Sequence, residues 1–205
     1  MNLTHALKAN SSGRDEVNLE PRYSIWMNVA LPRFRYHPDP AATGSVVDST
    51  SSCPVCGQTR GYTYTGPVFS AEEVEGLCPW CIADGSAAQR FEAEFTDIGA
   101  GVPAGVPTGV LDEIGRRTPG FSGWQQEHWL FHCGDGAGYL GRVGYSELMP
   151  LADALEALRD EGHMRGWSPD QVEGYLKSLS PTAAPTAYLF RCLHCGAYIA
   201  YSDFD

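Results

Sequence analysis

Positive charge is scarce in this chain of 205 residues: 25 aspartates and glutamates outnumber 14 lysines and arginines, and the formal net charge is −11. Nucleic acids are bound largely through lysine and arginine contacts to phosphates, so this balance disfavours a zinc-finger regulator that binds nucleic acid. The acidic side chains gather mainly in residues 71–97 and 146–180. They form either an ordinary solubilising surface or a patch complementary to a basic protein partner.

Long apolar runs are also missing, and no segment approaches the roughly 20 apolar residues that a membrane-spanning helix requires. The segment from Met1 to Lys8 lacks the basic and then apolar pattern of a secretory signal. We therefore expect a cytoplasmic protein with no membrane partner. In a reducing compartment, bound metal rather than disulfide bonds is the expected role of the seven cysteines.

Six of the seven cysteines form three pairs in which two residues separate the partners. Structural zinc is held by four ligands in a tetrahedron with Zn–S bonds of roughly 2.3 Å, and this tight spacing lets both sulfurs of a pair converge on the ion. The first two pairs are separated by 21 residues, close to the spacing of a four-cysteine zinc site. We therefore expect one structural zinc ion held by Cys53, Cys56, Cys78 and Cys81.

The residues around the pairs predict how they fold. Gly57 and Gly196 each follow the second cysteine of a pair, where a positive φ lets backbone N–H groups turn toward the thiolates. The second pair starts a segment that suits a helix over residues 78–91, with proline in its first turn. A hairpin is expected around residues 62–66. A zinc knuckle, meaning a cysteine pair in a tight turn followed by glycine, a hairpin and a second cysteine pair at a helix start are typical of a treble-clef-like zinc finger.

A thiol–disulfide redox motif is the alternative for Cys78-Pro-Trp-Cys81, because such motifs also lie at a helix N-terminus and also contain proline. A redox motif requires a βαβ arrangement, with a strand before the helix. Here Ser70 as an N-cap and Glu73 three residues later predict a helical turn in that place. The sequence therefore favours zinc over redox chemistry at this pair.

The third pair, Cys192 and Cys195, needs further ligands, and Cys133 is the cysteine that remains. His132 is a candidate for the fourth ligand of a second zinc ion. Adjacent residues in a strand point to opposite faces, so both His132 and Cys133 can bind only if the chain turns there. Without a second ion, Cys133 is a small buried apolar residue and the last pair is free. The other histidine candidates are His37 and His194, the latter expected to point outward.

The predicted elements indicate an α+β fold, in which the zinc finger joins a small mixed α/β body with two hairpins and two to three helices. Helices are expected over residues 110–117, 146–161 and 168–179, and hairpins are expected to pair residues 124–133 with 137–143 and residues 187–192 with 197–201. The expected parts of the chain are a partly disordered extension, residues 1–30; the zinc-finger part, residues 31–97; a Gly/Pro-rich loop, residues 98–109; and an α+β part with the last knuckle, residues 110–205.

Five strings of residues resemble a known family. They are Leu31-Pro-Arg-Phe-Arg-Tyr-His-Pro-Asp-Pro40, Leu77-Cys-Pro-Trp-Cys-Ile-Ala-Asp-Gly-Ser-Ala-Ala88, Gly123-Trp-Gln-Gln-Glu127, His132-Cys-Gly-Asp135 and Tyr188-Leu-Phe-Arg-Cys-Leu-His-Cys-Gly196. Together they resemble the CbrC-type family of small bacterial proteins over about residues 31–205. Because that family is linked to colicin tolerance, the resemblance implies a cytoplasmic role in protection against toxins. It implies no catalytic residues.

Two classes of function remain. A binding protein would cover a basic partner such as a bacterial toxin, with exposed aromatic side chains as anchors and acidic side chains around them. The core, by contrast, is expected to hold Trp124 and Trp129. Candidate anchors are Tyr62, Tyr64, Trp80 and Trp167.

The alternative is a zinc-dependent, hydrolase-like enzyme with a general base and an open-sided metal ion. No complete set of nucleophile, base and oxyanion donors is present in the sequence, so we expect binding rather than catalysis. The residues that such an enzyme would use are Glu127, His128, His132 and Asp135.

Overall fold

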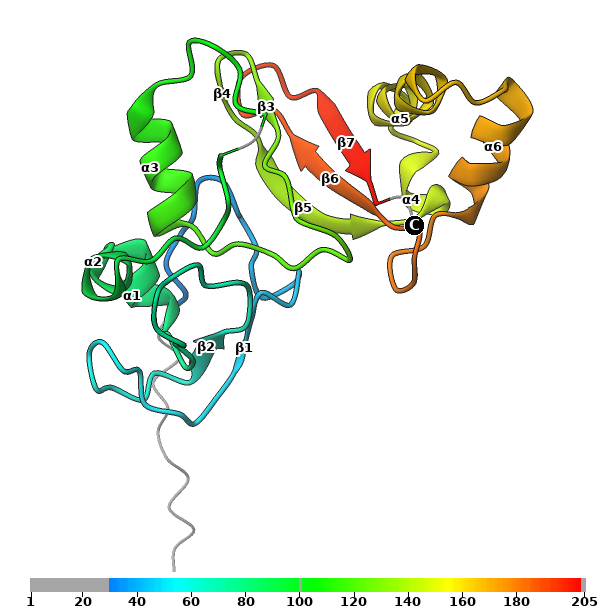
Figure 1. Ribbon diagram of the computed structural model, residues 1–205. Helices are drawn as coiled ribbons and strands as arrows, with labels where there is room; N and C mark the ends of the chain where they lie inside the picture. Colours follow the sequence, from blue (N-terminus) through cyan, green and yellow to red (C-terminus); the bar gives the residue numbers. More distant parts are fainter. Residues whose placement is uncertain (1–29, 100, 204–205) are drawn as a thin grey trace, which may run out of the picture.

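The computed structural model describes residues 30–99 and 101–203, and Figure 1 shows the arrangement of their helices and strands. Short helices are mixed with short antiparallel strands, which confirms the expected α+β class. The expected N-terminal extension, residues 1–30, lies outside the described residues except for its last one. In chain order the elements are β1 (Val46–Asp48), β2 (Tyr62–Tyr64), α1 (Pro79–Ala83), α2 (Ser86–Phe91), α3 (Thr108–Arg117), β3 (Phe131–His132), β4 (Asp135–Gly136), β5 (Gly138–Val143), α4 (Tyr145–Leu148), α5 (Ala152–Met164), α6 (Pro169–Ser178), β6 (Ala187–Arg191) and β7 (Tyr198–Ser202).

The largest sheet has the strand order β5-β6-β7, with both pairs antiparallel, and β6 and β7 confirm the hairpin expected at the end of the chain. Strand β6 lies in the middle and is apolar on both faces because both are covered. Ala187 and Leu189 belong to a core shared with the helices. Tyr188 and Phe190 belong to an aromatic core on the other face. The sheet therefore separates two cores.

Helices α4, α5 and α6 form the part of the molecule beside one end of this sheet (Figure 1). Helix α6 follows the prediction, and the Ser168 hydroxyl caps it. The single helix expected over residues 146–161 is wrong. The chain forms α4 and α5 instead, and the break falls at Pro150, because proline has no N–H to donate to the preceding helical turn. Together with α3, which begins at Thr108, these elements make four helices in the described residues from 108 onward, rather than two to three. None of the described helices is both long and apolar enough to cross a membrane.

Phe121 lies at the centre of the aromatic core. Its ring stacks on Tyr139 with centroids 3.8 Å apart, and it also contacts Trp129 and the two aromatic residues of β6. Trp129 is buried, as expected. The same prediction for Trp124 is wrong: this side chain is 51% exposed, and its ring lies under the Arg142 guanidinium at the surface. The aromatic core holds the segment before β3 against the sheet.

The hairpin expected between residues 124–133 and 137–143 is wrong in both length and partner. Strands β3 and β4 form a short hairpin closed by Cys133 and Gly134, whose φ angles are 53° and 73°. Positive φ at both central residues is typical of a type I′ turn, whose twist matches that of the strands. Strand β5 pairs with β6 instead, where Tyr139 lies opposite Phe190 and both rings are buried.

The zinc-finger part folds around the first two cysteine pairs. Strands β1 and β2 pair with each other from either side of the first cysteine pair, so the hairpin expected around residues 62–66 is not formed. The helix expected over residues 78–91 is split into α1 and α2 by Gly85, which has a φ of 82°. Ser70 lies in a bend rather than at a helix start. The core of this part includes Phe34, Leu77, Ile82 and Phe95.

Candidate metal centres and an acidic groove

The first group of cysteines combines a loop with a helix start. Cys53 and Cys56 lie in the loop between β1 and β2, and Cys78 and Cys81 lie at the start of α1. All four sulfur atoms lie within 4.8 Å of one another. Cys56 Sγ and Cys78 Sγ are 3.9 Å apart, close to the roughly 3.8 Å that two Zn–S bonds of about 2.3 Å give in a tetrahedron. This first group could therefore hold a zinc ion.

The surroundings of the first group suit thiolates that share a cation. Burial acts to raise the pKa of Cys53, but backbone N–H groups, including that of Cys78 at 3.4 Å, outweigh it and lower the pKa to about 7. Burial raises the pKa of Cys81 to about 11 and also raises that of Cys78. Cys78 and Cys81 therefore keep their protons in the absence of a cation, whereas a divalent ion would hold all four cysteines as thiolates.

The same pKa shifts weaken the redox alternative for Cys78 and Cys81. A redox pair needs a nucleophilic cysteine with a lowered pKa, and here burial raises the pKa of both. The helical turn expected at Ser70 is absent, so it does not argue against a redox motif. The strand pairing does argue against a redox motif. Within the described residues the strand before α1 is β2, which is antiparallel to β1 rather than part of a βαβ unit.

The second group consists of His132, Cys133, Cys192 and Cys195, whose ligand atoms also lie within 4.8 Å of one another. The turn that both adjacent residues need is present, because Cys133 occupies the type I′ turn after His132. His132 Nδ1 lies 3.2 Å from Cys133 Sγ and 3.4 Å from Cys195 Sγ. Cys133 is exposed, so it is not a buried apolar residue. This group could also hold a zinc ion.

The remaining histidine candidates are held elsewhere. His194 is exposed and lies outside the second group, in agreement with the outward orientation expected of it, and its Nε2 lies 2.8 Å from Asp135 Oδ2. His37 is fully buried, with one ring nitrogen 2.7 Å from the carbonyl oxygen of Pro119 and the other 2.7 Å from Thr43 Oγ1. Neither histidine belongs to a metal-binding group in the described residues.

The structure brings the residues that a zinc-dependent enzyme would use only partly together. Asp135 lies opposite His132 in the hairpin, but its carboxylate accepts hydrogen bonds at 2.7 Å from both Arg35 and Tyr36. Burial acts to raise the pKa of Asp135, and these donors outweigh it and lower the pKa. Glu127 is buried, and burial raises its pKa. Among the described hydrogen bonds, none joins Glu127 to His132 or Asp135. The structure therefore gives Asp135 a structural role.

The expected aromatic anchors are mostly covered. Tyr64 is buried, and its hydroxyl donates a hydrogen bond to the carbonyl oxygen of Pro67 at 2.7 Å. The half-buried Trp80 has the Arg60 guanidinium over its ring at 5.3 Å. Tyr62 is half-buried beside Trp80, and Trp167 packs on the helical core. Of the four expected anchors, therefore, Tyr64 is buried and the other three are half-buried.

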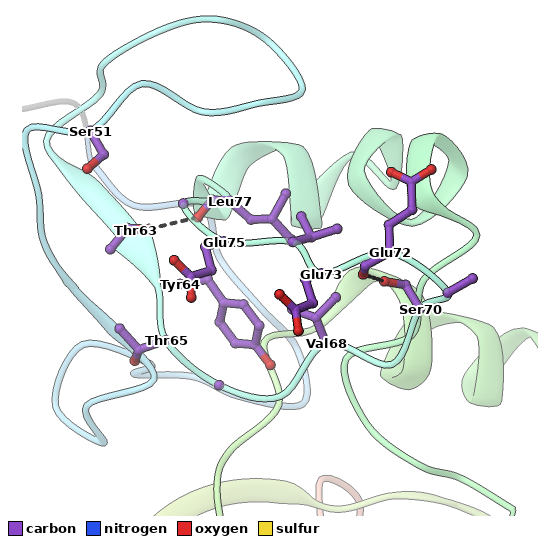
Figure 2. Close-up of a pocket in the computed structure, with 14 residues that line it drawn as sticks. Ser51, Thr63, Tyr64, Thr65, Val68, Ser70, Glu72, Glu73, Glu75 and Leu77 are labelled. Carbon is purple, nitrogen blue, oxygen red and sulfur yellow. Dashed lines mark hydrogen bonds between the residues drawn. The ribbon is translucent and has the colours of Figure 1, made fainter.

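An acidic groove lies next to the segment that leads to Cys78, and Figure 2 shows the residues that line it. It has a volume of about 800 Å³, and its walls come from β2 and from the segment that leads to Cys78. Glu72, Glu73 and Glu75 are exposed along it, and the carboxylate of Glu72 points away from the other two in Figure 2. The residues that line it include no lysine, arginine or histidine. The hydroxyl-bearing residues of the lining are Ser51, Thr63, Tyr64, Thr65 and Ser70.

Residues 31–204 match the model of one protein family, described as Uncharacterised protein family (UPF0167). The chain belongs to this family. The UPF0167 protein Mb2317 of Mycobacterium bovis and the UPF0167 protein MT2352 of Mycobacterium tuberculosis are each 57% identical to it over 175 residues, which cover 85% of this chain and 94% of theirs. The UPF0167 protein PA1536 of Pseudomonas aeruginosa is 42% identical over 181 residues, or 87% of this chain and 99% of its own. No solved structure matches this UPF0167 chain.

Proposed function

We propose that this UPF0167 protein binds a basic protein partner through the acidic groove, and that a zinc ion in the first group keeps the groove in shape. The observation that carries the proposal is the lining of the groove, which has three exposed glutamates, several hydroxyl groups and no basic side chain. Carboxylates in this arrangement complement the lysine and arginine side chains of a partner and steer its approach.

The glutamates of the groove are available to such a partner. Other acidic side chains are neutralised within the chain, as Glu173 is by Arg159 at 2.7 Å and Glu94 is by Arg116 at 3.4 Å. The ion pairs of the described residues include none of the three groove glutamates. Their charges would therefore be neutralised by a partner rather than by the protein itself.

The first group supports the groove through adjacent residues. Leu77 lines the groove and immediately precedes Cys78. The carbonyl oxygen of Leu77 accepts a hydrogen bond from Tyr64 N at 2.8 Å, which ties this wall to β2. A zinc ion at Cys78 would fix the wall, because metal-binding free energy becomes folding free energy in such sites. The order of knuckle, strand and helix start is consistent with a treble-clef-like finger.

We further propose that the basic partner is a bacterial toxin, which the protein neutralises by covering it. This step is supported by the resemblance to the CbrC-type family and its link to colicin tolerance, and by the acidic surface that suits a basic toxin. The groove favours any basic protein. Binding at the groove and the identity of the partner as a toxin are therefore tested separately.

The first test measures binding of a fluorescein-labelled peptide of arginine and glycine by fluorescence anisotropy. The full chain should bind it, and binding should weaken as salt is added. Changing Glu72, Glu73 and Glu75 together to glutamine should weaken binding by about 1–2 kcal/mol, or roughly 5- to 30-fold in Kd, since exposed ion pairs contribute up to about 1 kcal/mol each.

A matched control removes three exposed carboxylates far from the groove, on α5 and α6. Asp153, Asp160 and Asp170 changed together to asparagine give the same change in net charge. Equal weakening by both triple variants would show that only overall charge matters and would refute the groove. For the toxin step, cells that express the wild-type chain should survive a colicin challenge better than cells with the groove variant; equal survival would refute it.

A further inference from the structure

We propose that the second group (His132, Cys133, Cys192 and Cys195) binds a second zinc ion, and that this ion exchanges with ions in solution whereas the first is held fast. The group lies away from the acidic groove, at the end of the large sheet where β3 and β4 meet the turn between β6 and β7 (Figure 1). Four observations on the described residues, together with the distances between the ligand atoms, carry the inference.

The first observation is that the two knuckles have the same backbone hydrogen bonds. In the first knuckle Cys53 N donates to the carbonyl oxygen of Gln58 at 3.0 Å, and Gly57 N donates to that of Cys53 at 2.8 Å. In the second, the equivalent bonds are from Cys192 N to Ala197 at 2.8 Å and from Gly196 N to Cys192 at 3.2 Å. The N–H groups of His194 and Cys195 also point at Cys192 Sγ, at 3.4 and 3.5 Å. Both loops thus present sulfur in the same way.

The second observation is the residue in the type I′ turn. Asparagine, aspartate and glycine are the usual residues there, because both central positions need a positive φ. Cys133 takes a φ of 53°, and a left-handed conformation costs a residue with a side chain roughly 1–2 kcal/mol. No preference of the turn explains a cysteine at this position. A metal ligand does, because only this turn brings Cys133 and the adjacent His132 to the same ion.

The third observation is that a buried carboxylate clamps the hairpin to the knuckle. Asp135 lies opposite His132 on β4, and it accepts a hydrogen bond from His194 Nε2, inside the knuckle, at 2.8 Å. Arg35 and Tyr36 hold the same carboxylate from a third segment, each at 2.7 Å. Asp135 thus ties the hairpin that carries His132 and Cys133 to the knuckle that carries Cys192 and Cys195. The ligand atoms are therefore held in place by the protein itself.

The ligand distances suit zinc. A tetrahedral zinc ion with Zn–S of about 2.3 Å and Zn–N of about 2.0–2.1 Å separates sulfur from nitrogen by roughly 3.5 Å. The two separations of His132 Nδ1 from the sulfurs of Cys133 and Cys195, 3.2 and 3.4 Å, are close to this value. Three sulfurs and one imidazole are also a common structural zinc set, and soft thiolates disfavour magnesium and calcium. The assignment gives Nδ1 as the ligating nitrogen of His132.

The fourth observation is a difference in exposure between the groups. In the first group Cys53, Cys78 and Cys81 are buried, whereas in the second group Cys133 and Cys195 are exposed. Water and competing ligands can approach the second ion past two exposed cysteines, whereas in the first group Cys56 alone is not buried. The second ion should therefore exchange much faster, without loss of the fold.

Native mass spectrometry of the full chain, purified with zinc and without oxygen, tests this inference. The wild-type chain should carry two zinc ions, and isotopically enriched zinc in the buffer should replace one of them quickly. His132→Gln should carry one ion and lose the fast phase, and Cys133→Ala should do the same. His163→Gln, which changes an exposed histidine on α5, should keep both ions and the fast phase.

Circular dichroism confirms that each variant is folded before its metal content is read. A single zinc ion in the wild-type chain, two ions in His132→Gln or Cys133→Ala, or exchange of both ions at one rate would overturn the inference. So would a disulfide bond between Cys133 and Cys195 in the oxygen-free preparation. The result does not depend on peptide binding at the acidic groove, so failure of that proposal leaves this one standing.

Discussion

Replacing Glu127 with glutamine is expected to stabilise the protein at neutral pH. Glu127 is only 6% exposed, and its Oε1 has no hydrogen-bond partner among the described residues. Burial is the main cause that raises its pKa, and the negative charge of Asp97 adds to it. The folded protein therefore stabilises the ionised carboxylate poorly. A neutral amide of the same shape removes the cost of the charge.

The pH dependence follows from the raised pKa of Glu127. Because the folded state binds this proton more tightly than the unfolded state, the free energy of unfolding decreases as the pH rises toward the folded pKa. Above that pKa the wild-type chain carries the full penalty. An unpartnered buried polar group costs about 1–3 kcal/mol, and since the amide keeps part of that cost, we expect a gain of about 1 kcal/mol at neutral pH. Below about pH 4 the carboxyl is protonated in both states, and the gain should vanish.

Urea unfolding followed by circular dichroism, repeated from acidic to neutral pH, measures the effect. Glu92→Gln is the control, because Glu92 is exposed and surface substitutions usually change stability by less than about 0.5 kcal/mol. A lower free energy of unfolding for Glu127→Gln at neutral pH would refute the reasoning. It would mean that the carboxylate has a stabilising partner, and it would restore Glu127 as a candidate general base.

Three further substitutions test the metal groups and the core. Cys56→Ser should release one zinc ion and unfold the zinc-finger part, since structural zinc contributes about 10–16 kcal/mol in zinc-finger peptides; full zinc content with unchanged melting would contradict the first site. Phe121→Ala should lower the free energy of unfolding by about 3–5 kcal/mol in urea, because its buried ring stacks on Tyr139, and a near-neutral result would contradict the aromatic core. Asp135→Asn should weaken zinc binding about 10- to 100-fold at the second group alone, as measured by chelator competition; equal weakening at both groups would contradict the clamp.

Predictions that depend on neighbouring residues succeeded best. A glycine after a cysteine pair specifies a turn with positive φ, and Gly57 and Gly196 have φ angles of 68° and 77°. Ser168 followed by proline specifies a helix start, and α6 begins there. The spacing of the first two pairs was enough to predict that their sulfurs converge. Each of these features is decided within a few residues of chain.

Most predictions that needed partners far along the chain failed, although Cys133 does converge with Cys192 and Cys195 as expected. The partner of β5 is β6, which the local pattern does not reveal, and the exposure of Trp124 depends on Arg142 and the sheet edge. The clamp at Asp135 joins it to Arg35, 100 positions away, and carries no local signal. The helix break at Pro150 is different, because proline within a helical pattern already predicts it.

A zinc ion in the first group is proposed to hold the wall of the acidic groove in place. Anomalous diffraction at the zinc absorption edge, from crystals of the full chain, tests it most directly. We expect a strong peak at the centre of the first group, next to the groove wall at Leu77. Crystals grown with zinc that show no peak there, or a disulfide bond within that group, would contradict it.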